Sequence, residues 1–159
     1  MSERDRRPMA PIIRHIVEQH AEEAAFLWLL RDKAVDAPHY TRDDLSRLDE
    51  RVEAHLDGLR VAGEDGWEIM RAEMAAHPEM GEVFAAGVLA LESHDPLRIE
   101  EVINVTETVP ETVRGLISAL GWVRAETLRG TVSALLHDPS PHRRMLGVAA
   151  CSVQRVDPG

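Results

Sequence analysis

The feature that most limits the possible folds is an apolar pattern of helical period, cut into stretches by proline and glycine. From residue 13 on, apolar side chains recur every three or four residues, and no stretch alternates at period two long enough for a strand. Several breaks place a proline directly after Asp or next to Ser, which is typical of a helix start. The pattern therefore predicts an all-α protein.

The breaks divide the 159 residues into three parts. Residues 1–10 are charged and predict a flexible leader. Residues 11–63 hold two amphipathic stretches on either side of a break at Asp36, with Thr41 as an N-cap, and predict an antiparallel helical hairpin. The rest is expected to form six shorter helices, over residues 65–76, 79–91, 96–107, 111–121, 125–136 and 141–155.

A degenerate repeat runs through this third part. Arg114 and Arg144 lie thirty residues apart, and each is followed five positions later by an alanine. The stretch that begins at Pro78 also matches the stretch that begins at Pro110. Helix pairs with such a period are typical of α-solenoids. We therefore expect three HEAT-like helix pairs over residues 64–159, capped by the hairpin of residues 11–63.

The end of the chain departs from a usual solenoid, because residues 156–159 do not form a polar cap. Leu146, Val148 and Val153 are expected to face nothing within the chain. Two interpretations stay open: the chain is a fragment of a longer repeat array, or the last helix pair binds a partner.

Several blocks of sequence resemble a family of proteobacterial HEAT-repeat proteins that are often encoded near type VI secretion clusters. The blocks together span most of residues 15–159 and comprise residues 20–28, 54–63 with Gly66-Trp67, 83–86, 119–122 and 155–159. The resemblance implies a HEAT-repeat fold that usually continues into further repeats, and a partner among secretion components. It supplies no catalytic residues.

Composition excludes several classes of protein. The 28 acidic residues outnumber the 18 basic ones, for a net charge of −10, which argues against a nucleic-acid partner. A run of 18 apolar residues is absent, so no membrane span is expected. Cys151 is the only cysteine, which excludes a disulfide framework and predicts a buried, inert thiol. The first residues lack the apolar core of a signal peptide, so a cytoplasmic protein is expected.

His20 and His55 are the best candidates for a polar site. Both lie on the inward stripes of the predicted hairpin, at similar distances from its turn, so we expect them to meet. One interpretation is a metal or proton site, completed by Glu23 or Asp57. The favoured one is a pair of hydrogen-bonded packing histidines, since no HExxH motif is present. We therefore predict no metal, no cofactor and no catalytic residue.

The three tryptophans, Trp28, Trp67 and Trp122, are either exposed binding anchors or core residues, and we favour the core. Asp138 and Arg144 match the Asp/Arg pairs that tie neighbouring HEAT repeats together, with Arg114 as the equivalent arginine one repeat earlier. The alternative for these charges is an anion site on a concave face.

The function expected from these features is that of a non-catalytic interaction scaffold or adaptor that binds a basic protein or a secretion component. Binding is expected to use the second helix of each pair, through exposed residues: Glu79, Glu82, Glu111, Arg114, His142 and Arg143. An immunity-like inhibitor of a toxin is the alternative. A metal-dependent enzyme that uses His20 and His55 is a third hypothesis.

Overall fold

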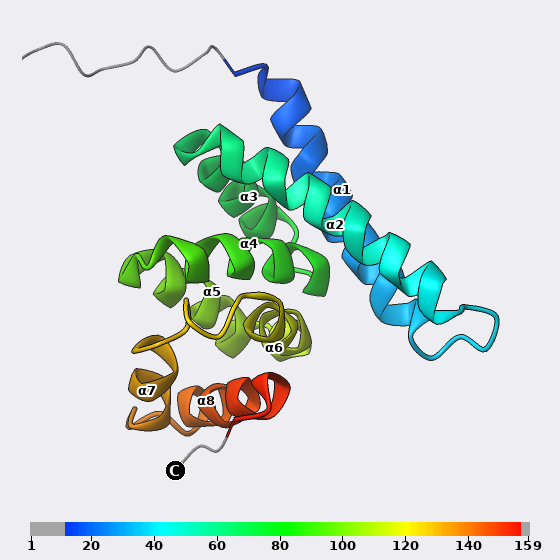
Figure 1. Cartoon of the computed structure of the whole chain (residues 1–159). Coiled ribbons are helices and arrows are strands. Elements are labelled where there is room, and N and C mark those ends of the chain that lie inside the picture. The colour runs from blue at the N-terminus through cyan, green and yellow to red at the C-terminus, as the bar shows by residue number, and fades with distance from the viewer. Residues whose placement is uncertain (1–11, 157–159) are drawn as a thin grey trace, which may run out of the picture.

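The computed structural model describes residues 12–156, and the leader expected at residues 1–10 lies outside them. The described chain forms α-helices and one 3₁₀ turn, without a strand in residues 12–156, so the all-α prediction is confirmed (Figure 1). The elements are α1 Arg14–Ala34, α2 Arg42–Ala62, α3 Glu64–Ala76, α4 Met80–Ser93, α5 Pro96–Thr108, η1 Pro110–Thr112, α6 Val113–Trp122, α7 Thr131–Leu136 and α8 Pro141–Gln154.

One predicted helix is wrong in its first half. The helix expected over residues 125–136 begins only at Thr131, and residues 124–130 form successive turns whose amides bond three residues back. Gly130 has φ +84°, a backbone conformation that interrupts a right-handed helix and that glycine adopts easily. Leu128 is buried and holds the turn segment against the rest of the chain.

The hairpin of α1 and α2 follows from local sequence. Thr41 accepts a hydrogen bond from the Asp44 amide, and the Asp44 carboxylate accepts one from the Thr41 amide, which completes a capping box. Charge on the Asp44 carboxylate favours these bonds, and its hydrogen bonds to Thr41 lower its pKa. The box fixes the start of α2, so that α2 runs back along α1.

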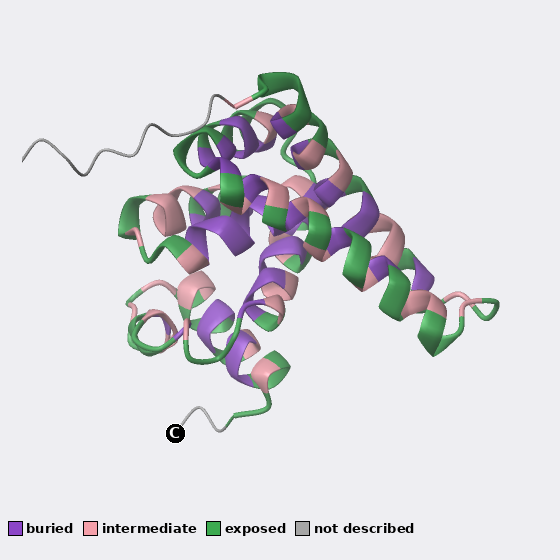
Figure 2. Cartoon of the chain, turned by 45° about the horizontal axis from the view of Figure 1, so that its top comes forward, coloured by how far each residue is buried: buried purple, intermediate pink, exposed green. Residues whose placement is uncertain are grey.

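Helix α4 is the centre of the molecule. Every residue from Val83 to Leu91 is buried, because α4 contacts α1, α3, α5 and α6 on its different sides (Figure 2). A helix that is apolar on all faces is stable only when neighbours cover it all round. The Phe84 ring stacks on Trp28 at 5.0 Å and meets Trp122 edge-on at 5.3 Å, which links α1, α4 and α6.

The structure confirms the core interpretation for Trp28 and Trp67, which are 1% and 4% exposed. Trp122 is half-buried, and its indole N–H donates to the Glu53 carboxylate of α2 at 2.6 Å. This bond joins the end of α6 to the hairpin, so none of the three tryptophans is a free surface anchor.

Glycines let successive helices approach closely. A β-carbon on Gly81 of α4 would lie 2.5 Å from the Ala25 carbonyl oxygen of α1. A β-carbon on Gly115 of α6 would lie 2.1 Å from the Met80 carbonyl oxygen of α4. Both distances are below van der Waals contact, so each interface requires glycine at a helix start.

Helix α8 ends the described structure and packs against α6 and α7. Leu146 is fully buried, so the expectation that it faces nothing is wrong, because α8 turns this side toward its neighbours. Val148 and Val153 are 53% and 42% exposed, as expected. Within residues 12–156, no helix combines the length and apolar character needed to cross a bilayer.

Candidate functional site

A hollow lies between α1 and the turn that joins α3 to α4, and we name it the acidic cleft. Its volume is about 330 Å³. The cleft is lined by four carboxylates, one histidine and one exposed aromatic ring, together with small apolar residues: Glu22, Phe26, Glu73, His77, Glu79 and Glu82 carry its side-chain chemistry. Two of the predicted partner-binding residues, Glu79 and Glu82, therefore lie together in one cleft.

Local sequence places these two acids. Pro78 separates α3 from α4, and Glu79 is the N-cap residue of α4, with Glu82 in its first turn. Acidic side chains are favourable there because the N-terminal end of a helix carries partial positive charge. Gly81 brings this end of α4 onto the backbone of α1, and the carboxylates thereby come beside Glu22 and Phe26.

Within residues 12–156, no ion pair neutralises the charges in the cleft. Burial raises the pKa of Glu82, and the nearby Glu79 and Glu73 raise it further, while a hydrogen bond to its own backbone and the nearby His77 lower it. Across residues 12–156, no arginine, lysine or histidine forms an ion pair with any of the cleft's four glutamates. An unbalanced group of carboxylates that is partly desolvated favours a cationic ligand.

Several helix pairs are joined by an arginine that is paired with a carboxylate of the other helix. Arg60 of α2 is the clearest case, since it donates to Glu53, Asp57 and Glu92. Burial opposes its charge, but the three carboxylates outweigh burial and raise the pKa of Arg60. Within residues 12–156, no such arginine pairs with the carboxylates of the acidic cleft.

Phe26 is the functional candidate that the sequence did not reveal. It sits in an apolar stretch that predicts burial, yet its side chain is 61% exposed at the edge of the cleft. Helical period places Leu27 and Trp28 on the inward stripe of this helix and leaves Phe26 off it. The stretch is apolar nearly all round, so the sequence predicts cover on more than one side, but in the structure the Phe26 side stays open.

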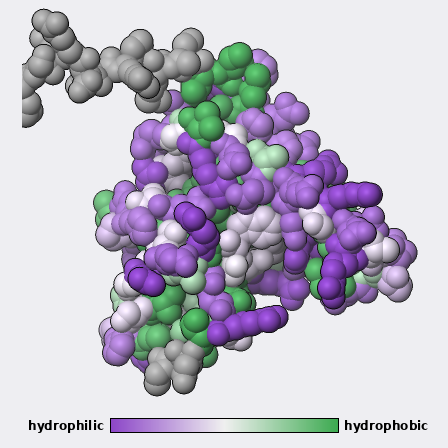
Figure 3. Space-filling model, in the orientation of Figure 1, coloured by the Kyte–Doolittle hydropathy of each residue, from purple (hydrophilic) through white to green (hydrophobic). Residues whose placement is uncertain are grey.

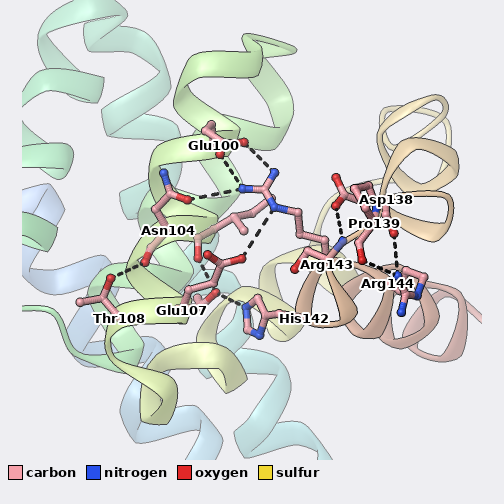
Figure 4. A network of polar contacts seen from close by, with 12 residues as sticks. Glu100, Asn104, Glu107, Thr108, Asp138, Pro139, His142, Arg143 and Arg144 are labelled. Carbon is pink, nitrogen blue, oxygen red and sulfur yellow. Dashed lines mark hydrogen bonds and ion pairs between the residues drawn. The ribbon is translucent and has the colours of Figure 1, made fainter.

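His142 and Arg143 are not the exposed binding residues that the sequence predicted (Figure 4). The Arg143 guanidinium donates to the Glu100 carboxylate of α5 at 2.7 Å, and its side chain is only 18% exposed. His142 Nε2 lies 2.8 Å from Thr106 Oγ1, which itself donates to the Ile103 carbonyl, so the histidine is the donor. Both side chains therefore join α8 to α5.

Arg114 and Glu111 remain exposed, but they differ in their contacts. Arg114 makes three hydrogen bonds to the Asp32 carboxylate of α1, at 2.9–3.1 Å. These bonds raise the pKa of the Arg114 guanidinium. Glu111 is exposed in the η1 turn and is not among the residues that line the acidic cleft.

The predicted side-chain pair of Asp138 and Arg144 is also wrong. Arg144 donates to the backbone carbonyls of Asp138 and Pro139, at 2.9 and 2.7 Å. The Asp138 carboxylate instead accepts from the Ser140 amide at 2.8 Å, ahead of α8. The two side chains shape the α7–α8 turn, and this local role replaces the expected tie between repeats.

His20 and His55 meet as their spacing predicts. Their Nδ1 atoms lie 3.0 Å apart, and both rings are half-buried between α1 and α2. Burial lowers the pKa of His55, the His20 charge lowers it further, and Glu23 raises it. Among the residues described, no three His, Cys, Asp or Glu side chains come together as metal ligands. The 3.0 Å separation of the two Nδ1 atoms is that of a hydrogen-bonded pair.

Comparison with known proteins adds no further constraint on this site. No protein-family model, curated protein or solved structure matches the chain. The functional argument therefore depends on the geometry and charges of the described residues.

Proposed function

We propose that this chain is a non-catalytic interaction module whose acidic cleft binds a cationic segment of a protein partner. The observation that carries the proposal is the group of four cleft carboxylates with no cation from the described chain to balance them. The half-buried Glu82 makes this imbalance costly, since burial disfavours its charge. A partner's arginine or lysine would remove that cost by pairing with it.

Phe26 adds to the fit of such a ligand. An arginine side chain can stack on an aromatic face and donate hydrogen bonds to carboxylates at the same time. In the cleft, the exposed Phe26 ring and the carboxylates of Glu22 and Glu82 line one hollow. The net charge of −10 would also speed the approach of a basic partner at low salt.

We further propose that the scaffold is a short α-solenoid of HEAT-like helix pairs. Helices α4, α6 and α8 contact one another in succession, as the second helices of stacked pairs would. Helices α3 and α5 are joined by Glu64–Arg98 and Arg71–Glu101, and the order of these ion pairs along both helices is that of parallel neighbours. These contacts support a repeated arrangement, with the hairpin of α1 and α2 at one end.

The resemblance to HEAT-repeat proteins encoded near type VI secretion clusters suggests where to look for the partner. A scaffold or adaptor would bind several secretion components with modest affinity. An immunity-like inhibitor would bind one toxin tightly, with its carboxylates against a basic active site. Stoichiometry and affinity of the natural complex distinguish these two roles.

The binding site can be tested with a labelled peptide that alternates arginine and alanine, and with the same peptide carrying neutral citrulline for arginine. We expect the arginine peptide to bind more tightly, and Glu79→Gln with Glu82→Gln to weaken it by roughly tenfold, about 1.4 kcal/mol. The matched control, Glu50→Gln with Asp65→Asn, removes the same charge outside the cleft. Equal losses in both double variants, or equal binding of the two peptides, would contradict the proposed site.

A further inference from the structure

The acidic cleft opens on α1, the helix that follows the first eleven residues of the chain, which we name the N-terminal segment. Glu18, Glu22 and Phe26 are spaced by four and therefore lie in one row on α1, and this row leads from the start of the helix into the cleft. Arg14 begins the row, but it donates to Glu18 at 2.7 Å, and Glu22 forms no ion pair within residues 12–156. A cation that reached the cleft along this row would therefore meet Glu22 first.

The described fold leaves the start of α1 uncovered. Ile13 and Ile16 are both exposed, and apolar side chains gather at the surface beside the beginning of the described chain (Figure 3). Neighbouring exposed apolar side chains are typical of a surface that another segment covers. The N-terminal segment is covalently joined to this place, so it is the segment best positioned to cover it.

The N-terminal segment also holds the charge that the cleft selects. It carries three arginines against Glu3 and Asp5, a net charge of +1, whereas the whole chain has −10. Arg6 and Arg7 are adjacent, and they follow both acids, so they are the two cations nearest to α1. The cleft presents four glutamates and one histidine, and its carboxylates have no ion pair within residues 12–156. Charge complementarity therefore favours Arg6 and Arg7 as occupants.

The length of the segment fits this placement. Arg7 precedes Ile12 by five residues. Five extended residues span about 17 Å. From Arg14 to Glu22, helix α1 rises by about 12 Å. The long arginine side chain adds to the reach of the backbone, so a segment that folds back along α1 can bring these guanidinium groups to the cleft.

We propose that Arg6 and Arg7 occupy the acidic cleft of their own chain, and that a cationic partner must displace them in order to bind. This inference rests on the proposed function, because it takes the cleft as a site for arginine side chains. A short tether holds its ligand at an effective concentration on the order of 1 mM, so weak pairing is enough to fill the cleft. Glu3 and Asp5 limit the attraction, which lets a partner of denser positive charge displace the segment. The segment thereby selects against weakly cationic partners.

The first test compares binding of the labelled arginine–alanine peptide to the wild-type chain and to Arg6→Gln with Arg7→Gln. A tethered occupant lowers the fraction of open clefts, so we expect this variant to bind the peptide roughly fivefold more tightly. The matched control, Arg42→Gln with Arg47→Gln, removes two exposed arginines of α2 and should change the affinity far less. An equal gain in both arginine variants would overturn the proposal, because net charge alone would then explain it.

A second readout locates the N-terminal segment without any peptide. A nitroxide on Ser2→Cys should broaden the amide signals of Glu22, Phe26 and Gly81, and the buried Cys151 should stay unlabelled. Arg6→Gln with Arg7→Gln should remove most of this broadening. Broadening that does not depend on the two arginines would overturn the inference while leaving the cleft as a site for a partner.

Two further outcomes separate this inference from the proposed function. If the broadening depends on Arg6 and Arg7 but the peptide binds neither chain, the contact of the segment is supported and the proposed partner is wrong. A mixture of isotope-labelled chains and nitroxide-labelled chains tests the remaining occupant. Broadening between separate chains in this mixture would overturn the inference, because the segment would then fill the cleft of a second copy.

Discussion

The Nδ1 atoms of His20 and His55 lie 3.0 Å apart and join the two helices of the N-terminal hairpin. A β-carbon on Gly58 of α2 would lie only 2.4 Å from the His20 ring, so glycine provides the space for this ring. One imidazole must donate and the other accept, and an imidazolium can only donate. The pair therefore tolerates one added proton but not two.

This geometry predicts that the hairpin weakens in mild acid. The pKa of His55 is lowered from 6.5 in the folded chain, first by burial and then by His20. Its contribution to stability is therefore complete above the unfolded pKa and is lost as pH falls through the folded pKa. We expect His55→Gln to reduce the stability difference between about pH 8 and pH 5 by roughly 0.5 kcal/mol, since the ring is partly solvated. Urea unfolding at both pH values measures this difference.

The matched control for this experiment is His39→Gln, which removes an exposed histidine of the α1–α2 turn. It should leave the pH dependence of stability as in the wild type. A His55→Gln chain whose stability falls toward pH 5 as steeply as that of the wild type would show that the pair does not titrate as argued.

The contribution of Glu82 to stability should depend on pH in the opposite direction. Burial raises its pKa above the ordinary 4.5, so its contribution to stability is complete below that value and is lost as pH rises through the raised pKa. Glu82→Gln should therefore stabilise the chain by roughly 0.5 kcal/mol near pH 7 and leave it unchanged near pH 4. Thermal unfolding at the two pH values measures the effect, with Glu50→Gln, an exposed change on α2 outside the cleft, as control. Loss of stability near pH 7 would contradict this account.

Particular elements show which parts of the fold the sequence predicts. Proline breaks and the Thr41 cap locate the hairpin and most shorter helices, because these signals act on the backbone within a few residues. The helix expected over residues 125–136 fails because Gly130, an ordinary residue in a helical pattern, adopts a positive φ once Leu128 packs inward. The backbone conformation of Gly130 therefore depends on tertiary contacts, which a helical pattern does not contain.

The site is harder to predict than the fold for a related reason. Arg114 pairs with Asp32, which lies 82 positions away in the sequence. An arginine without such a partner could have the same local sequence, so the local sequence does not predict this ion pair. The spacing of His20 and His55 around one turn was enough to predict their contact, since an antiparallel hairpin fixes their register. The acidic cleft forms where α4 crosses α1, and the hydrophobic periodicity of the sequence does not predict that crossing.

The close approach of α6 to α4 predicts a strong effect of a single methyl group. A β-carbon on Gly115 would meet the Met80 carbonyl oxygen, and a backbone atom cannot turn away as a side chain can. Gly115→Ala should therefore lower the free energy of unfolding by about 2 kcal/mol, despite the higher helix propensity of alanine. On Gly121 the added carbon meets only the Val153 side chain, at 3.2 Å. Gly121→Ala should stay within about 0.5 kcal/mol of the wild type, and equal effects of the two changes in chemical unfolding would count against the backbone explanation.

Helix α8 packs on α6 and α7 through buried residues such as Leu146 and Ala150, and polar side chains add a second attachment, to α5. The Arg143–Glu100 pair and the His142–Thr106 hydrogen bond both bridge α5 and α8. The bond to Glu100 raises the pKa of Arg143, and the same bond lowers the pKa of Glu100. The pair is accessible to water on the Glu100 side, which is 47% exposed, so its coupling energy should be modest.

A double-mutant cycle over this pair gives the corresponding prediction. Arg143→Gln and Glu100→Gln should each lower the free energy of unfolding by about 1 kcal/mol, and the double variant should lose little more than either one. Amide exchange in α8 should rise in all three variants while exchange in α4 rises far less, because α4 is held by apolar burial on every side. Glu111→Gln, an exposed change outside the contacts between α5 and α8, should neither lower the free energy of unfolding nor raise amide exchange in α8. Additive losses in the cycle, or uniform exchange across α4 and α8, would mean that this pair does not anchor the end of the molecule.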